Sequence, residues 1–124
     1  NPVRFENLQD TFIRNTLYRP ALQSVLEATG INIGECSTVL QEVLWSTSVQ
    51  HGASGASSIF ASAIRGLDES SQNFDRDLIT KVYNVRKQHF QSASSTIRQT
   101  VKARLTREMN LALSLLNGTS ARVI

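Results

Sequence analysis

Residues 39–52 read V-L-Q-E-V-L-W-S-T-S-V-Q-H-G and form the most apolar helical window of the chain. At helical spacing, Val39 and Val43 lie on one face of this segment. Trp45 and Val49, one turn apart, point the other way. A helix that is apolar on two sides is usually buried on both. We therefore expect this helix at the centre of the domain, with the rest of the chain packed around it.

The end of this helix carries a polar cluster, which consists of Ser46, Thr47, Gln50 and His51. Gly52 is expected to stop the helix, because glycine adopts the left-handed C-terminal conformation without steric cost. The residues after it, 53–58, are rich in glycine, alanine and serine. The cluster is therefore predicted to lie where a core helix meets a small-residue loop, as one wall of a binding cleft.

The remaining sequence also favours helices. Apolar residues recur at three- and four-residue spacing, and no strand-like alternation persists. Ser37 or Thr38 suits the N-cap of the central helix. The other helices are expected at residues 3–15, 20–29, 54–65, 74–90 and 95–117, and glycines 30, 66 and 118 are expected to end three of them. The predicted fold class is all-α, a compact multi-helix domain around a buried central helix.

Length and composition indicate one globular domain. The chain has 124 residues, of which 40% are hydrophobic and 19% charged. We expect a helical domain over residues 1–118, as the C-terminal part of a larger catalytic domain, and a flexible tail over residues 119–124. The chain opens on Asn1 rather than methionine, which we interpret as a processed product or an excised fragment. No apolar run is long enough to predict a membrane span, and a single cysteine, Cys36, is interpreted as a packing residue.

The net charge of +3 is unevenly spread. Residues 68–77 are acidic, whereas the C-terminal third is basic. Aromatic residues do not alternate with the basic ones as stacking platforms, so no nucleic acid is expected as a partner. Solvated helix faces are the favoured interpretation of the charge, and attraction to the anionic cell wall is the next.

Three blocks of sequence resemble a group of bacterial peptidoglycan hydrolases. These blocks are L-W-S-T-S-V-Q-H-G at residues 44–52, F-I-R-N-T-L-Y-R-P at residues 12–20 and L-I-T-K-V-Y-N-V-R at residues 78–86. The group occurs as C-terminal parts of type VI secretion effectors and spike proteins, and as phage-tail enzymes. The resemblance covers about residues 5–116 and implies a lysozyme-like helical fold. It also implies a catalytic acid in a Gly- and Tyr-rich segment N-terminal to the part of the family seen here, and this chain has no such segment.

Residues of the polar cluster have both functional and structural interpretations. His51 can hydrogen-bond a substrate or transfer a proton near neutral pH, or it can tie the helix end to a carbonyl group. Gln50 can donate to and accept from a sugar N-acetyl group, or it can be a satisfied buried amide. Tyr83 and Arg86, one turn apart in a later helix, can line the same cleft or belong to an ordinary amphipathic face. Trp45 is interpreted as a core aromatic residue.

No residue stands out as the acid that glycosidase chemistry needs. Asp68 and Glu69 are expected to be surface charges of a loop. Glu42 is the one weak catalytic candidate, because it lies on the central helix one turn before Ser46, although an exposed helix-surface glutamate is the favoured interpretation. His51 and His89 are far apart and no metal-binding spacing exists, so neither a metal site nor a cofactor is expected.

These observations predict the C-terminal part of a lysozyme-like hydrolase that cleaves the glycan strand of peptidoglycan. Its principal acid is expected upstream of this chain. The predicted partners are peptidoglycan, the N-terminal part of the same protein and an immunity protein. The expected place of action is the periplasm of a target cell, after secretion, or a phage virion. The alternative is a non-enzymatic helical module of a phage tail or secretion apparatus, with a structural or partner-binding role.

Overall fold

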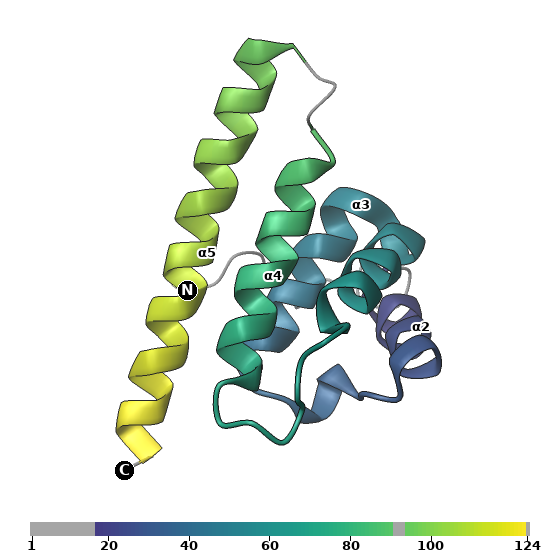
Figure 1. Ribbon diagram of the computed structural model, residues 1–124, viewed down its shortest axis with the longest axis vertical. Helices are drawn as coiled ribbons and strands as arrows, with labels where there is room; N and C mark the ends of the chain where they lie inside the picture. Colours follow the sequence, from purple (N-terminus) through teal and green to yellow (C-terminus); the bar gives the residue numbers. More distant parts are fainter. Residues whose placement is uncertain (1–16, 91–93, 124) are drawn as a thin grey trace.

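The computed structural model describes residues 17–90 and 94–123, with side chains up to Leu116. Over these residues the helices are joined by turns and loops and there is no strand, which confirms the predicted all-α class. The elements, shown in Figure 1, are α2 (Arg19–Thr29), η2 (Ile33–Glu35), α3 (Thr38–Ile64), α4 (Phe74–Gln88) and α5 (Ser95–Val123). The helix expected at residues 3–15 lies outside the described residues. Over the described ranges, no helix is both long and apolar enough to cross a membrane.

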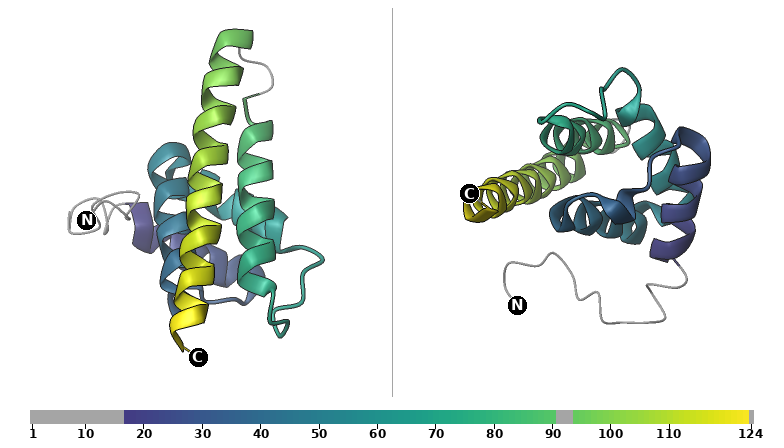
Figure 2. Two further views of the ribbon diagram at one scale, coloured as in Figure 1. Left: turned by 90° about the vertical axis from the view of Figure 1, so that its left-hand side faces the viewer. Right: turned by 90° about the horizontal axis from the view of Figure 1, so that it is seen from below.

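The first half of α3 is the centre of the domain, as predicted. The Ser37 side chain accepts a hydrogen bond from the backbone N–H of Leu40 and so caps the helix start. Val43 and Leu44 are fully buried, and Trp45 is only 3% exposed. The helix packs against α2, α4 and α5. Figure 2 shows why both of its faces are covered, because α2 and α5 lie on opposite sides of the molecule.

Gly52 divides α3 into two helical halves. Its backbone angles, φ 78° and ψ 168°, are far from helical values, so the first half ends there as the sequence predicts. An L-residue would be strained in this region, which glycine enters freely. The chain resumes a helical path at once, and the second half buries Ala56, Ile59 and Phe60 in the core. The kink leaves the side chains of Gln50 and His51 at the end of the first half.

The segments before α3 follow the predicted pattern. Helix α2 ends at Gly30, whose φ of 79° is left-handed and whose N–H donates to the Leu26 carbonyl. The short connector forms the 3₁₀ turn η2, which Asn32 caps by accepting from the Gly34 N–H at 2.9 Å. Ile33, in this turn, is fully buried in the core.

Helices α4 and α5 run antiparallel, side by side (Figures 1 and 2). Leu78, Ile79 and Val82 bury one face of α4. Helix α5 continues to Val123, so the predicted end of this helix at Gly118 is wrong. A glycine inside a helix costs only about 1 kcal/mol relative to alanine, which is too little to stop a helix of this length by itself. The division into a domain of residues 1–118 and a tail of residues 119–124 stays a prediction.

Candidate functional site

Polar side chains from three helices meet inside the otherwise apolar core. Helix α3 contributes Ser46, Thr47 and Gln50, α4 contributes Tyr83 and Arg86, and α5 contributes Glu108. We call these six side chains the polar network. Residues three or four positions apart share one face of a helix, which explains why the pairs within each helix point the same way. The network therefore lies at the junction of α3, α4 and α5.

Glu108 is the acceptor at the centre of the network. Its oxygen Oε2 accepts a hydrogen bond from Ser46 Oγ at 2.5 Å and another from the Tyr83 hydroxyl. Nη1 of Arg86 lies 3.5 Å from the same oxygen. A carboxylate oxygen with three donors around it, one of them a cation, is held firmly in one position. Each donor comes from a helix other than α5, so this one oxygen links all three helices.

Arg86 is a buried cation whose guanidinium group donates hydrogen bonds to several oxygen atoms. Only 1% of its side chain is exposed. In addition to Glu108, Nη1 donates to Thr47 Oγ1 at 3.2 Å, and Nη2 donates to Gln50 Oε1. The guanidinium also lies 4.9 Å from the centre of the Tyr83 ring, within cation–π range. Burial lowers the pKa of Arg86, an effect that nearby Tyr83 and Glu108 oppose, and the group stays charged.

Tyr83 keeps its proton under all ordinary conditions. Burial, and then the neighbouring Glu108 carboxylate, raise the pKa of its hydroxyl far above the ordinary value of 10. The hydroxyl is therefore a permanent donor to Glu108 and cannot serve as a base near neutral pH.

The second oxygen of Glu108 differs from the first. The side chain is 18% exposed. Within the described residues Oε1 receives no hydrogen bond, and it is not among the buried polar atoms that lack a partner. Oε2 is therefore held by its three donors, while the side chain as a whole keeps part of its surface exposed at the edge of the network.

His51 lies beside the network, at the kink of α3. Its ring centre is 5.3 Å from that of His89 and 6.0 Å from that of Phe90. A Cβ added to Gly55 would come within 2.9 Å of the His51 Cβ, so the side chain packs closely on this glycine. Burial, followed by the charges of Arg86, His89 and Arg104, lowers the pKa of His51 to about 4. The imidazole is therefore neutral at pH 7, and its buried Nε2 has no hydrogen-bond partner among the described residues.

The structure thus brings together the six residues that the sequence selects, although most of them are enclosed. Ser46, Thr47, Tyr83 and Arg86 are all buried, whereas Gln50, His51 and Glu108 are only partly covered. A ligand that approached this junction would therefore meet Gln50, His51 and Glu108 first. We call these three residues the network edge.

The three acids considered from the sequence occupy two different environments. Glu42 is buried on α3, so its interpretation as an exposed surface residue is wrong. The two faces of the first half of α3 are both covered, which explains the burial. Asp68 and Glu69 lie exposed in the loop between α3 and α4, as expected. Hydrogen bonds from Ser70 lower the pKa of Asp68, which is consistent with a local turn.

Glu108 was not selected from the sequence, although two signals point to it. It is the only acidic residue after Asp77. It also falls within the apolar stripe of α5, between Leu105 and Ala112, both of which are fully buried. A lone carboxylate at a core-facing position needs a buried partner, and Arg86 supplies it.

Cys36 lies apart from this site, in a hollow lined by residues of α2, η2 and the start of α4. Burial, followed by the charge of Asp75, raises the pKa of its thiol to about 11. The thiol is therefore protonated at neutral pH, which favours its interpretation as a packing residue. No group of three His, Cys, Asp or Glu side chains in the described parts of the chain is arranged to hold a metal ion.

The fold and the site together define an all-α domain whose main helices are joined by a buried ionic network with a partly open carboxylate. Residues 1–109 match the family described as type VI secretion system spike protein VgrG3-like, C-terminal, and the chain belongs to this family. No curated protein and no solved structure shows significant similarity to the chain.

Proposed function

We propose that this domain is the helical part of a bacterial cell-wall hydrolase and that its network edge contacts the glycan strand of peptidoglycan. Membership of the type VI spike family supports delivery toward another bacterial cell. The resemblance of the W-S-T-S-V-Q-H-G block to peptidoglycan hydrolases supports the choice of substrate. In this proposal the domain acts in the periplasm of the target cell, with antibacterial effect, and an immunity protein in the producing cell blocks it.

The observation that carries the proposal is the position of Glu108. Glycosidases use two carboxyl groups, of which one protonates the leaving group and the other acts as base, nucleophile or electrostatic stabiliser. Glu108 accepts from Ser46 and Tyr83 and pairs with Arg86, so it suits an acceptor and a negative charge. It does not suit a proton donor. We assign Glu108 to the second role and the acid to a segment upstream of this chain, as the resemblance implies.

The hydrogen bond from Arg86 fixes the orientation of the Gln50 side-chain amide. Because the guanidinium has only donors, the amide oxygen of Gln50 must face Arg86, and its NH₂ group faces the other way. No described residue accepts a hydrogen bond from that NH₂ group. The NH₂ group of Gln50 is therefore suited to donate to the carbonyl of a sugar N-acetyl group. Beside it, neutral His51 can donate or accept at the same edge.

The test uses the complete parent protein and measures the release of reducing ends from purified peptidoglycan. Glu108→Gln keeps the shape of the side chain and removes its charge, so activity is expected to fall by roughly 100-fold or more if the carboxylate acts in the reaction. Gln50→Ala is expected to raise KM more than it lowers kcat. Glu69→Gln, an exposed acid on the loop after α3, is the matched control and should keep full activity.

The same experiment includes the chain of residues 1–124 alone, which is expected to lack full activity until the upstream segment is added back. Efficient cleavage by the chain alone would place the acid within it, and Glu42 would then be the first residue to mutate. Wild-type activity of folded Glu108→Gln protein would contradict the role assigned to this carboxylate.

A non-enzymatic helical module of the secretion apparatus or of a phage tail is the second candidate. The observation that favours it is the enclosure of Thr47, Tyr83 and Arg86, since a network that only holds three helices together needs no opening. A complete parent protein that folds but neither binds nor cleaves peptidoglycan would support this candidate over the first.

A further inference from the structure

Two arginines, Arg86 and Arg104, accompany the single carboxylate of the network edge, Glu108. Arg104 precedes Glu108 by one turn of α5, and residues at this spacing share one face of the helix. His89, at the C-terminal end of α4, has its ring 5.3 Å from that of His51. Both Arg104 and His89 are exposed. Glu108, which pairs with the buried cation of Arg86, is the one acidic residue of the sequence after Asp77.

The charge of Arg104 acts on two residues of the site, the partly covered His51 and the buried Arg86. Its charge lowers the pKa of His51 and that of Arg86, next to the larger effect of burial on each group. Its position one turn from Glu108, which pairs with Arg86, places Arg104 on the same face of α5. Among the described residues, no ion pair of Arg104 is found.

Two buried nitrogen atoms in the same region, Nε of Arg86 and Nε2 of His51, have no hydrogen-bond partner among the described residues. Buried polar groups are nearly always paired in folded proteins. A polar group of a ligand at the network edge, directly or through water, could pair with Nε2 of the partly covered His51.

We propose that His51, His89 and Arg104 form a subsite for a carboxylate of the ligand, so that this domain selects peptide-bearing glycan by the acidic groups of its peptide stems. This inference rests on the proposed function. In peptide-bearing peptidoglycan the sugar units are uncharged, and the free carboxylates lie on the stems. Glu108 and Gln50 would then contact the sugars, while the exposed Arg104 and His89 would contact the stem.

The side chains around the edge differ in how firmly they are held, and this difference fits the two parts of the ligand. Arg104 and His89 are exposed and adjustable, which suits a flexible peptide. Gln50 and Glu108 are fixed by Arg86, which suits the more rigid sugar rings.

The test measures binding of three probes to the complete protein by calorimetry. The first probe is a peptidoglycan fragment with free stem carboxylates, the second is the same fragment with those carboxylates converted to methyl amides, and the third is a neutral chito-oligosaccharide of equal sugar length. The free-carboxylate fragment is expected to bind about tenfold more tightly than its amidated form, the size of one charge-assisted contact. Raising the salt concentration should reduce this difference, because the cations are exposed.

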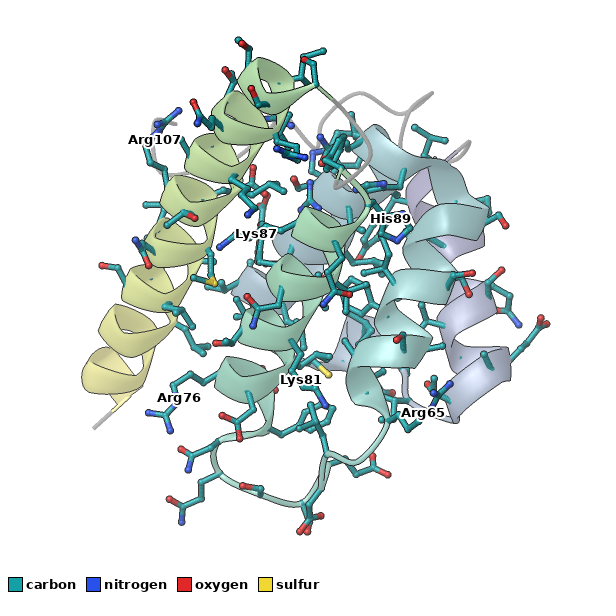
Figure 3. All side chains as sticks on the ribbon, turned by 45° about the horizontal axis from the view of Figure 1, so that its top comes forward. Arg65, Arg76, Lys81, Lys87, His89 and Arg107 are labelled. Carbon is teal, nitrogen blue, oxygen red and sulfur yellow. The ribbon has the colours of Figure 1, made fainter. Side chains whose placement is uncertain are left out.

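Arg104→Gln is expected to remove the preference and leave the affinity for the amidated fragment unchanged. Arg65→Gln is the control, since Arg65 is an equally exposed cation that lies well away from His89 (Figure 3). It should keep the preference. His89→Gln should weaken the preference by a smaller factor, because the glutamine amide keeps a hydrogen-bond donor at this position.

The outcomes separate the two proposals. Equal binding of the free and amidated fragments by the wild-type protein would overturn the carboxylate subsite and leave the proposed function standing. Equal loss of affinity for all probes in Arg104→Gln would also overturn it, because that pattern indicates a general structural effect. Failure of the wild-type protein to bind any of the three probes would overturn the proposed function itself, and the subsite with it.

Discussion

The hydroxyl of Tyr83 on α4 donates a hydrogen bond to Oε2 of Glu108, which lies 25 residues later on α5. Ser46 on α3 donates to the same oxygen. The contact therefore belongs to a buried network in which the three longest described helices each supply a partner. In such surroundings each hydrogen bond is strong, and each group left without a partner is costly. The stability of the domain is expected to depend on this single carboxylate more than on any surface ion pair.

Removal of the carboxylate should destabilise the fold. Glu108→Ala leaves the buried charge of Arg86 without its counter-ion, and breaking a buried pair in this way costs about 3–5 kcal/mol. Because Glu108 is 18% exposed, we expect a loss of about 3 kcal/mol, at the lower end of that range. Urea denaturation measures the effect, with Glu69→Ala as an exposed control that should change little. A change in Glu108→Ala no larger than in the control would show that Arg86 finds other partners.

The Tyr83 hydroxyl can be tested without any change in packing volume. Tyr83→Phe removes one donor to Glu108 and should lower the free energy of unfolding by about 1–2 kcal/mol. Combined with Glu108→Gln, its effect should be smaller than the sum of the two single changes, because both remove the same hydrogen bond. Strict additivity in a double-mutant cycle would indicate that the two side chains do not interact in solution.

Much of the fold follows from local sequence signals. Ser37 caps α3 and Gly30 ends α2 as their positions predict, because each acts on backbone groups within a few residues. The continuation of α5 through Gly118 could not be predicted in this way, since one glycine only weakly opposes a long helix.

The candidate site is less predictable than the helices. Gln50 could be selected at a polar helix end and Arg86 in a later helix, but Glu108, which contacts both Arg86 and Ser46, is 62 residues from Ser46. Spacing along the chain cannot reveal such a pair, because it depends on how α5 packs against α3. The burial of Tyr83 and Arg86 could not be predicted for the same reason. Apolar residues at helical spacing do not show which polar residue between them will be enclosed.

The packing of the central helix gives a prediction that needs no knowledge of function. Leu44 is fully buried, so Leu44→Ala should cost about 2–5 kcal/mol through lost burial and a residual cavity. Val49, in the same helix, is 44% exposed, and Val49→Ala should change the stability by less than about 1 kcal/mol. Thermal and urea denaturation of the two variants provide the comparison. Similar midpoints for both would contradict the central position of the helix.

The kink in α3 should depend on Gly52. Its φ of 78° and ψ of 168° form a conformation that essentially only glycine adopts and that costs an L-residue about 1–3 kcal/mol, and no atom lies within 4 Å of the position of an added Cβ. Gly52→Ala should therefore destabilise the domain through backbone strain alone, by about that amount. Ser54→Ala, an exposed position in the following turn, is the control and should be neutral. If Gly52→Ala were as stable as the control, the kink would not persist in solution.

The final prediction concerns the dependence of stability on pH through His51. Its pKa is about 4 in the fold and 6.5 as the ordinary value, because burial and the charges of Arg86, His89 and Arg104 disfavour the protonated form. Above pH 6.5 the imidazole is neutral in both states, so its contribution is constant. As the pH falls from about 6.5 to about 4, the unfolded chain binds a proton that the folded chain does not, and the free energy of unfolding decreases.

The decrease is expected to be about 1–2 kcal/mol over this interval, since partial exposure of His51 reduces the effect below the full value for its pKa shift. Denaturation curves between pH 4 and pH 7.5 measure it. In His51→Gln the slope over this interval should be smaller by that amount. Equal slopes in the wild type and His51→Gln would mean that His51 titrates alike in the folded and unfolded chains, and would contradict its placement beside the buried network.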